Sequence, residues 1–110
     1  MRPAIEAGDW LLVDPTVRSW PRRGSIVLFR EPDTGGLALK RVAGRPGDRV
    51  PFADGYLHLA EDEAWLLGDA ESVSHDSRRY GPVTVDLLVG RTWFRYGPPH
   101  RIGRLPRRSG

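Results

Sequence analysis

The chain has 110 residues, of which 39% are hydrophobic and 28% are charged, and its formal net charge is +3. This length and composition predict one folded domain with a single modest core, and they exclude a disordered chain. The sequence contains no cysteine, so disulfides, thiolate metal sites and a cysteine nucleophile are excluded.

Short apolar pieces separated by turns predict an all-β domain, since 13 glycines and 10 prolines punctuate the chain. The turns include a loop at 31–36 and a two-residue hairpin at Asp54-Gly55. Residues 70–82 are polar and predicted to form a loop. We therefore expect a small, mostly antiparallel β-domain built of hairpins, whose sheet edges must be closed or covered. In chain order, the predicted strands cover residues 10–13, 25–29, 37–43, 49–52, 56–59, 64–67 and 89–96, with one helical turn at 85–88.

The predicted strand at 37–43 carries Lys40. Because side chains alternate along a strand, Lys40 shares one face with Ala38 and Val42. These neighbours are small or medium apolar residues, so this setting would partly desolvate the lysine amine. The opposite face carries the remaining residues, Leu37, Leu39, Arg41 and Ala43.

Lys40 is also the sole lysine of the chain, since 16 of the 17 basic residues are arginine. Arginine fills most surface charge roles but cannot release its proton at physiological pH, whereas lysine can. The bias is consistent with a need for one amine that can become neutral, and it is equally consistent with chance.

The end of the chain is basic. Such a tail could contact nucleic acid or anionic lipid, but a solvated, frayed end is favoured, and no aromatic-basic platform supports a nucleic-acid partner. We expect a core at residues 1–100 and a basic tail at residues 101–110. No apolar run approaches the ~20 residues of a membrane span, and no signal peptide is visible. The basic residues of the tail are Arg101, Arg104, Arg107 and Arg108.

Three blocks of sequence occur in a distinctive order. The first is Met-Arg-Pro-Ala at residues 1–4, followed by a Gly-Asp strand at residues 8–13. The second is Lys-Arg-Val-Ala-Gly-Arg-Pro-Gly-Asp at residues 40–48, preceded by the segment Arg-Gly-Ser-Ile-Val-Leu-Phe at residues 23–29. The third joins Gly-Asp-Ala at residues 68–70 to Ser-His-Asp-Ser-Arg at residues 74–78 and Gly-Pro-Val at residues 81–83. Together these blocks resemble the signal peptidase I family of Ser-Lys peptidases over nearly the whole chain.

This resemblance implies a catalytic role for Lys40 as the general base of a serine endopeptidase. It also implies that the hydroxyl of Ser74 orients the Lys40 amine, and that an ion pair between Asp76 and Arg78 braces the loop that carries Ser74. A Ser-His-Asp triad at residues 74–76 is discounted, because neighbours in one loop cannot point at one another as triad members do.

The resemblance further implies that the substrate pairs as an added strand with Leu37, Ala38 and Leu39. It implies neither a cofactor nor a metal site, and the three histidines lack metal-binding spacing. The expected partner is a peptide or preprotein substrate, and the family implies an apolar surface near the active site that rests on the membrane.

The nucleophile is the main departure from the family pattern. The family's serine stands directly before the methionine that aligns with Met1, so Met1 and Pro3 are what this sequence shows of that motif. The chain as printed is therefore predicted to be inactive. Either the start lies too late within a longer, active peptidase, or the chain is a degenerate, inactive relative. The coincidence of Met1 with the motif's methionine favours the first.

The expected function is the removal of leader peptides or propeptides after small residues by a Ser-Lys dyad. The expected location is the extracytoplasmic side of a membrane, if the full-length chain carries an anchor. Two alternatives stay open: a soluble maturation protease for one dedicated partner, and a non-catalytic peptide-binding β-domain.

Overall fold

The computed structural model describes residues 8–69, 75–97 and 99–105. These residues form mostly antiparallel β structure, which confirms the all-β fold class. The strands are β1 (Trp10–Asp14), β2 (Ile26–Arg30), β3 (Leu37–Gly44), β4 (Arg49–Phe52), β5 (Gly55–His58), β6 (Glu63–Leu67), β7 (Val83–Thr84), β8 (Leu88–Gly97) and β9 (Gly103–Arg104). One α-helical turn, α1 (Ser77–Tyr80), and two 3-10 turns, η1 (Val85–Leu87) and η2 (Pro99–Arg101), complete the description.

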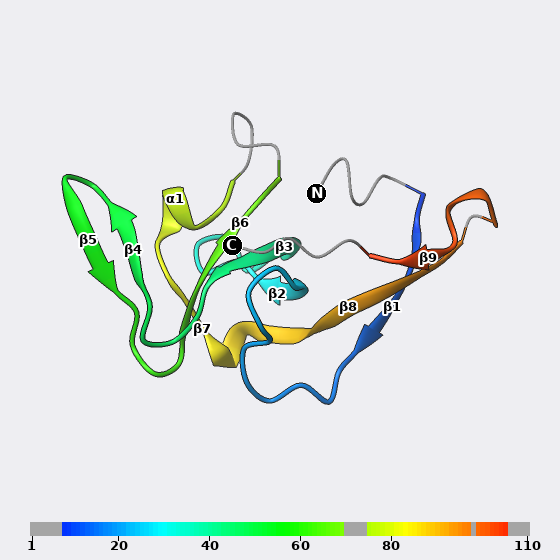
Figure 1. The fold of residues 1–110 in the computed structure, drawn as a ribbon, viewed down its shortest axis with the longest axis horizontal. Coiled ribbons are helices and arrows are strands. Elements are labelled where there is room, and N and C mark those ends of the chain that lie inside the picture. The colour runs from blue at the N-terminus through cyan, green and yellow to red at the C-terminus, as the bar shows by residue number, and fades with distance from the viewer. Residues whose placement is uncertain (1–7, 70–74, 98, 106–110) are drawn as a thin grey trace.

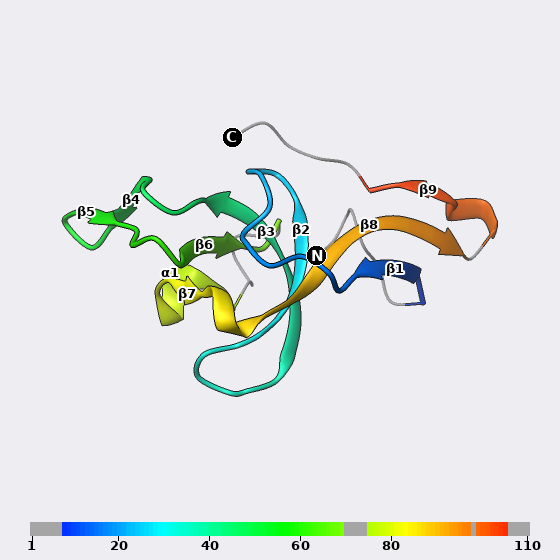
Figure 2. The ribbon, with the colours of Figure 1, turned by 90° about the horizontal axis from the view of Figure 1, so that it is seen from below.

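The main sheet has the strand order β1-β8-β2-β3-β6-β7 (Figure 1). Strand β9 pairs with Phe94 and Arg95 of β8, on the edge of β8 opposite β1. Strand β8 therefore lies between two strands from the first third of the chain. The β4–β5 hairpin forms a separate two-stranded sheet that projects from one end of the molecule, as Figure 2 also shows.

The main core covers one face of β2, β3 and β6. Val27, Phe29 and Leu66 are fully buried there, and Val42 packs with them. Trp20 closes the core from the loop before β2, and its indole Nε1 donates a 2.9 Å hydrogen bond to the carbonyl oxygen of Asp62. A smaller cluster around Trp65 fills the opposite face of β6 and anchors the β4–β5 hairpin.

The β4–β5 hairpin was predicted, but its turn is shifted by one residue. Phe52 pairs with Gly55, so the two-residue loop is Ala53–Asp54 and not Asp54-Gly55. This register places Val50 opposite Leu57, and both side chains pack in the Trp65 cluster. Because a one-residue slip would turn these side chains to the other face, packing decides the register. The consequence is a left-handed backbone at Ala53, with φ of 52°.

Two further segments differ from or extend the expectations. Helix α1 lies inside the stretch 70–82 that was predicted as a loop, because a single helical turn leaves no periodic pattern in the sequence. Turn η1 agrees with the helical turn predicted at 85–88. Strand β9 falls within residues 101–110, which were assigned to a basic tail, and it pairs with Phe94 and Arg95.

Within the described part of the chain, the helices are single turns, and none of them has the length and apolar character needed to cross a membrane.

Candidate active site

Lys40 lies in the middle of β3 on the face that carries the main core. Ala38 and Val42 flank it on the same strand, and both pack in the core cluster of Val27. Val27, which is fully buried, stands directly opposite Lys40 on β2. Leu39 instead packs against Ile26 in a different cluster. The predicted division of β3 into two faces is thus confirmed, and the partly buried Lys40 has an apolar setting.

Lys40 also lies beside an open sheet edge. Strand β6 pairs with β3 only from Arg41 onward, and among the described residues no strand pairs with that edge at Leu37–Lys40. The main-chain groups of Val42 bond to the residues just before β2: its N–H donates to the carbonyl oxygen of Ser25 at 2.8 Å, and its carbonyl oxygen accepts from the N–H of Gly24 at 2.8 Å. Because bonded residues alternate in an antiparallel ladder, Lys40 also bonds to β2, and the N–H and C=O of Leu39 face the open edge.

Arg41 joins β3 to the end of β6. Its guanidinium donates to both carboxylate oxygens of Asp69, with Nε–Oδ1 at 3.0 Å and Nη2–Oδ2 at 2.9 Å, and Nη1 donates to the carbonyl oxygen of Gly24 at 2.9 Å. Arg41 directly follows Lys40 in the chain, so this buried ion pair lies next to the proposed site. It was not predicted, because the partners are 28 residues apart, although both stand within the motif blocks.

Asp76 and Ser77 close the outer edge of β6. The carboxylate of Asp76 accepts from the backbone N–H of Gly68 at 2.9 Å, and the hydroxyl oxygen of Ser77 accepts from the N–H of Leu66 at 2.9 Å. Both side chains are fully buried. They satisfy N–H groups that β7, which pairs only with the start of β6, does not reach.

Asp76 also forms an ion pair with Arg78, with Nη2–Oδ2 at 2.5 Å and Nε–Oδ1 at 3.0 Å. Burial by itself raises the pKa of Asp76, but the hydrogen bonds from Arg78 and from the Gly68 amide outweigh it and hold the pKa below its usual value. Asp76 is therefore ionised at neutral pH, and it also caps α1 by accepting from the N–H of Arg78.

His75 contacts the β2–β3 loop. Its Nε2 lies 2.8 Å from Oδ2 of Asp33 and 3.8 Å from Oε2 of Glu31. The ring also packs edge-on against Tyr80, with the ring centres 5.2 Å apart. His75 thus contacts a carboxylate of another loop; because Ser74 lies outside the described residues, the expectation that residues 74–76 form no triad stays a prediction. The meeting of Glu31, Asp33 and His75, whose ligand-type atoms lie within 4.8 Å of one another, was not predicted.

Tyr80 links His75 to the main core, against which its ring packs. Its hydroxyl oxygen is buried and has no hydrogen-bond partner among the described residues. Burial raises the pKa of Tyr80 above its usual value, and the charges of Glu31, Asp76 and Asp33 raise it further. Tyr80 is thus neutral at pH 7 and packs between the imidazole and the main core.

Three of the predicted site residues, Met1, Pro3 and Ser74, lie outside the described residues. The structure brings Lys40 and the loop of Asp76 and Arg78 to the same end of β6, where β3 extends beyond it.

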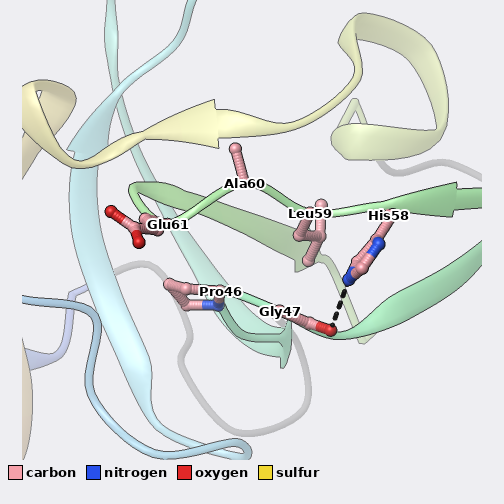
Figure 3. Close-up of a pocket in the computed structure, with 6 residues that line it drawn as sticks. All are labelled: Pro46, Gly47, His58, Leu59, Ala60 and Glu61. Carbon is pink, nitrogen blue, oxygen red and sulfur yellow. Dashed lines mark hydrogen bonds between the residues drawn. The ribbon is translucent and has the colours of Figure 1, made fainter.

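A pocket that lies apart from this site has a volume of about 480 Å³ (Figure 3). It stands at the base of the β4–β5 hairpin, where Nε2 of His58 bonds to the carbonyl oxygen of Gly47 at 3.0 Å. None of the predicted site residues lines it. Its walls are Pro46, Gly47, His58, Leu59, Ala60 and Glu61.

Comparison with known proteins agrees with this geometry. The family model described as "Signal peptidase, peptidase S26" matches residues 1–61 and 51–97. The chain belongs to this signal peptidase family. The S26 peptidases are serine peptidases, so the chain is of signal-peptidase type, and the resemblance seen in the three sequence blocks is confirmed.

The relatives of this chain include a bacterial signal peptidase and mitochondrial proteases of animals. The chain is similar to mitochondrial inner membrane protease subunit 1 of Xenopus tropicalis, with 33% identity over 96% of this chain and 68% of the relative. The human protein of the same name is 32% identical over 96% of this chain and 69% of its own length. Signal peptidase I of Leptolyngbya laminosa is 28% identical over 96% of this chain and 68% of its own length.

Proposed function

We propose that this chain is the catalytic core of a signal-peptidase-type serine endopeptidase that uses a Ser-Lys dyad, with Lys40 as the general base. The observation that carries the proposal is the place of Lys40 on β3. The amine stands on an apolar face beside an open strand edge, in a family of serine peptidases. Lys40 is the sole lysine of the chain, and an arginine side chain could not supply a neutral amine in this place.

The proposed reaction has two steps. The serine hydroxyl attacks the scissile carbonyl carbon and gives its proton to the amine of Lys40, which then passes the proton to the leaving nitrogen as the C–N bond breaks. Water next attacks the acyl carbon and gives a proton to Lys40. As the ester C–O bond breaks, Lys40 returns this proton to the serine oxygen, which regenerates the serine hydroxyl and the neutral amine and releases the peptide acid. Arginine at residue 40 could not act in this way, since it keeps its proton.

In this proposal the nucleophile is a serine directly before Met1, and Ser74 orients the Lys40 amine. Two observations support a fixed place for the loop that begins at Ser74. Asp76 binds the backbone at Gly68, and the Asp76–Arg78 ion pair closes the loop on itself. The proposed role of this ion pair is to brace that loop.

The proposed substrate is an extended peptide with small residues before the scissile bond, which adds as a strand at Leu37, Ala38 and Leu39. The outward-facing N–H and C=O of Leu39 supply main-chain hydrogen bonds of the kind that an added strand needs. We propose that the active protein works at a membrane surface, on the extracytoplasmic side. The names of the mitochondrial relatives, which are inner membrane proteases, support a membrane location.

The experiment compares the printed chain with a chain extended by the segment encoded upstream of Met1, or by a designed segment that ends in serine. Each protein is incubated with a leader peptide that has alanine before the scissile bond, and the products are identified by mass spectrometry. We expect cleavage by the extended chain only. Replacing the added serine by alanine, or Lys40→Arg, should each reduce the rate by a factor of roughly 10³ or more.

Two outcomes would contradict the proposal. Normal cleavage by Lys40→Arg would show that Lys40 is not the base. Tight binding of the leader peptide without cleavage, in a folded chain that contains both serine and Lys40, would favour the peptide-binding alternative. Circular dichroism of every variant separates loss of chemistry from loss of fold.

A further inference from the structure

The contact between His75 and the β2–β3 loop joins two segments that are far apart in sequence. Nε2 of His75 and Oδ2 of Asp33 are 2.8 Å apart across 42 residues. Glu31 stands behind this contact at 3.8 Å and is itself held by Thr34, whose hydroxyl donates to its Oε1 at 2.9 Å. Two carboxylates from one loop therefore face one imidazole from another.

The two segments that meet here lead to the two parts of the proposed site. The β2–β3 loop continues into β3, and Lys40 is the fourth residue of that strand. His75 stands between Ser74, which lies outside the described residues, and Asp76, whose carboxylate binds the Gly68 amide. The contact between His75 and Asp33 thus joins the segment that begins at His75 to the loop that leads into β3, the strand that carries Lys40.

The orientation of the His75 ring is fixed from a second side. Tyr80 of α1 packs edge-on against it and is itself packed on the main core. The charged neighbour on its own segment, Asp76, is already paired with Arg78. The imidazole therefore interacts with the carboxylates of Asp33 and Glu31. A protonated imidazole is attracted by both carboxylates more strongly than a neutral one.

A purely stabilising role explains this arrangement poorly. The side chains of His75 and Asp33 are 40% and 41% exposed, and ion pairs in such positions add little to folding stability because water screens them. A weak contact can nevertheless place a loop accurately, and displacement of a catalytic group by 1 Å can cost about a hundredfold in rate.

We propose that His75 is a positioning residue: its contact with Asp33 and Glu31 holds the segment of His75 and Asp76 in place relative to Lys40. This inference rests on the proposed function, since it assigns His75 a role at that same site. His75 touches neither the substrate nor the reacting atoms in this account, and it acts through the loop.

The test is a double-mutant cycle in the serine-containing chain. One change is His75→Ala and the other is the pair Glu31→Gln with Asp33→Asn. We expect each to lower kcat about tenfold, with KM changed less than twofold, and the combination to lower kcat no further. His75→Arg, which keeps a cation within reach of Asp33, should recover most of the rate. The matched control is His58→Ala, since His58 also makes one exposed hydrogen bond, at the distant pocket of Figure 3.

A second readout does not need catalysis. The Gly68 amide donates to Asp76, so displacement of the loop should speed its hydrogen exchange about tenfold or more in His75→Ala and leave it unchanged in His58→Ala. Because Lys40 is the sole lysine, lysine-labelled protein gives one side-chain NMR signal, which should move in His75→Ala alone.

The possible failures are distinguishable. If the serine-containing chain cleaves nothing, the proposed function fails, and the exchange and NMR experiments still decide whether His75 holds the loop. If His75→Ala leaves kcat, the Gly68 exchange rate and the Lys40 signal unchanged, the positioning role is wrong. Additive losses in the double-mutant cycle would overturn the proposed pairing with Asp33 and Glu31.

Discussion

The guanidinium of Arg41 and the carboxylate of Asp69 face each other through two parallel hydrogen bonds, at 3.0 and 2.9 Å. Their side chains are 7% and 3% exposed, so the pair is almost fully removed from water. Arg41 follows Lys40 directly, and Asp69 follows the end of β6. The pair therefore fixes the spacing between β3 and the end of β6 immediately beside the proposed base.

We expect Asp69→Asn to lower the free energy of unfolding by about 3–5 kcal/mol, because it leaves a buried guanidinium without its counter-charge. Urea denaturation followed by fluorescence measures this loss. The matched control is Arg23→Gln, which removes an exposed ion pair to Asp48 at 3.7 Å and should cost at most about 1 kcal/mol. If the two variants lost equal amounts of free energy of unfolding, the buried Arg41–Asp69 pair would be no more important for stability than the exposed pair.

The lowered pKa of Asp76 predicts that the folded protein loses stability in acid. Since its pKa in the folded protein lies below the usual value, its ionised form stabilises the fold above the unfolded value of about 3.9. This contribution is lost as the pH falls through the lower, folded value. The free energy of unfolding should therefore decrease below about pH 4. Asp76→Asn should be less stable at pH 7, by about 2 kcal/mol, and its stability should depend less on pH in this range.

Asp14 provides the control for that titration. Its pKa is also lowered, by hydrogen bonds from the side chain and backbone of Thr16, but the carboxylate lies at the surface. Water screens such a group, so Asp14→Asn should leave the acid-induced loss of stability nearly unchanged. A curve for Asp76→Asn that kept the full pH dependence of the parent chain would show that another group carries it.

The sequence predicted those features that depend on local pattern. The alternation of Ala38, Lys40 and Val42 put the proposed base on the core face of β3, and packing of Ala38 and Val42 in one cluster agrees with it. The β4–β5 hairpin also followed from its turn residues, although the burial of Val50 and Leu57 moved the turn by one residue.

Features that depend on distant contacts were not predictable in this way. Strand β8 enters the sheet between β1 and β2, and no local pattern indicates which strands it joins. The Arg41–Asp69 and His75–Asp33 contacts span 28 and 42 residues. Side-chain type alone did not distinguish these charged residues from surface residues, because most charged residues are exposed.

Gly44 lies in the motif block at residues 40–48, where β3 packs closely against the β4–β5 hairpin. Adding a methyl group at this position tests how tight that packing is. A Cβ at this position would lie 2.9 Å from Cγ1 of Val50 and 3.1 Å from atoms of Leu59 and Trp65. Val50 is a β-branched residue in β4 and cannot swing aside. We expect Gly44→Ala to cost about 1–3 kcal/mol from overpacking, measured by thermal or urea denaturation. Gly55→Ala is the control, since no atom lies within 4 Å of its Cβ position.

The open edge of β3 predicts an effect on substrate binding that is separable from folding. Proline at residue 39 removes an N–H that faces the open edge, whereas proline at residue 38 removes one that bonds to β2. In the serine-containing chain, Leu39→Pro should therefore fold and raise KM about five- to tenfold, the worth of one hydrogen bond. Ala38→Pro should unfold.

Leu39→Ala separates the packing of this side chain against Ile26 from its main-chain role. It keeps the outward N–H and loses only side-chain contacts, so it should lower stability with little change in KM. Both quantities come from denaturation curves and steady-state cleavage of the same leader peptide. If Leu39→Pro and Leu39→Ala raise KM equally, the substrate does not use the Leu39 amide, and the added strand must lie elsewhere.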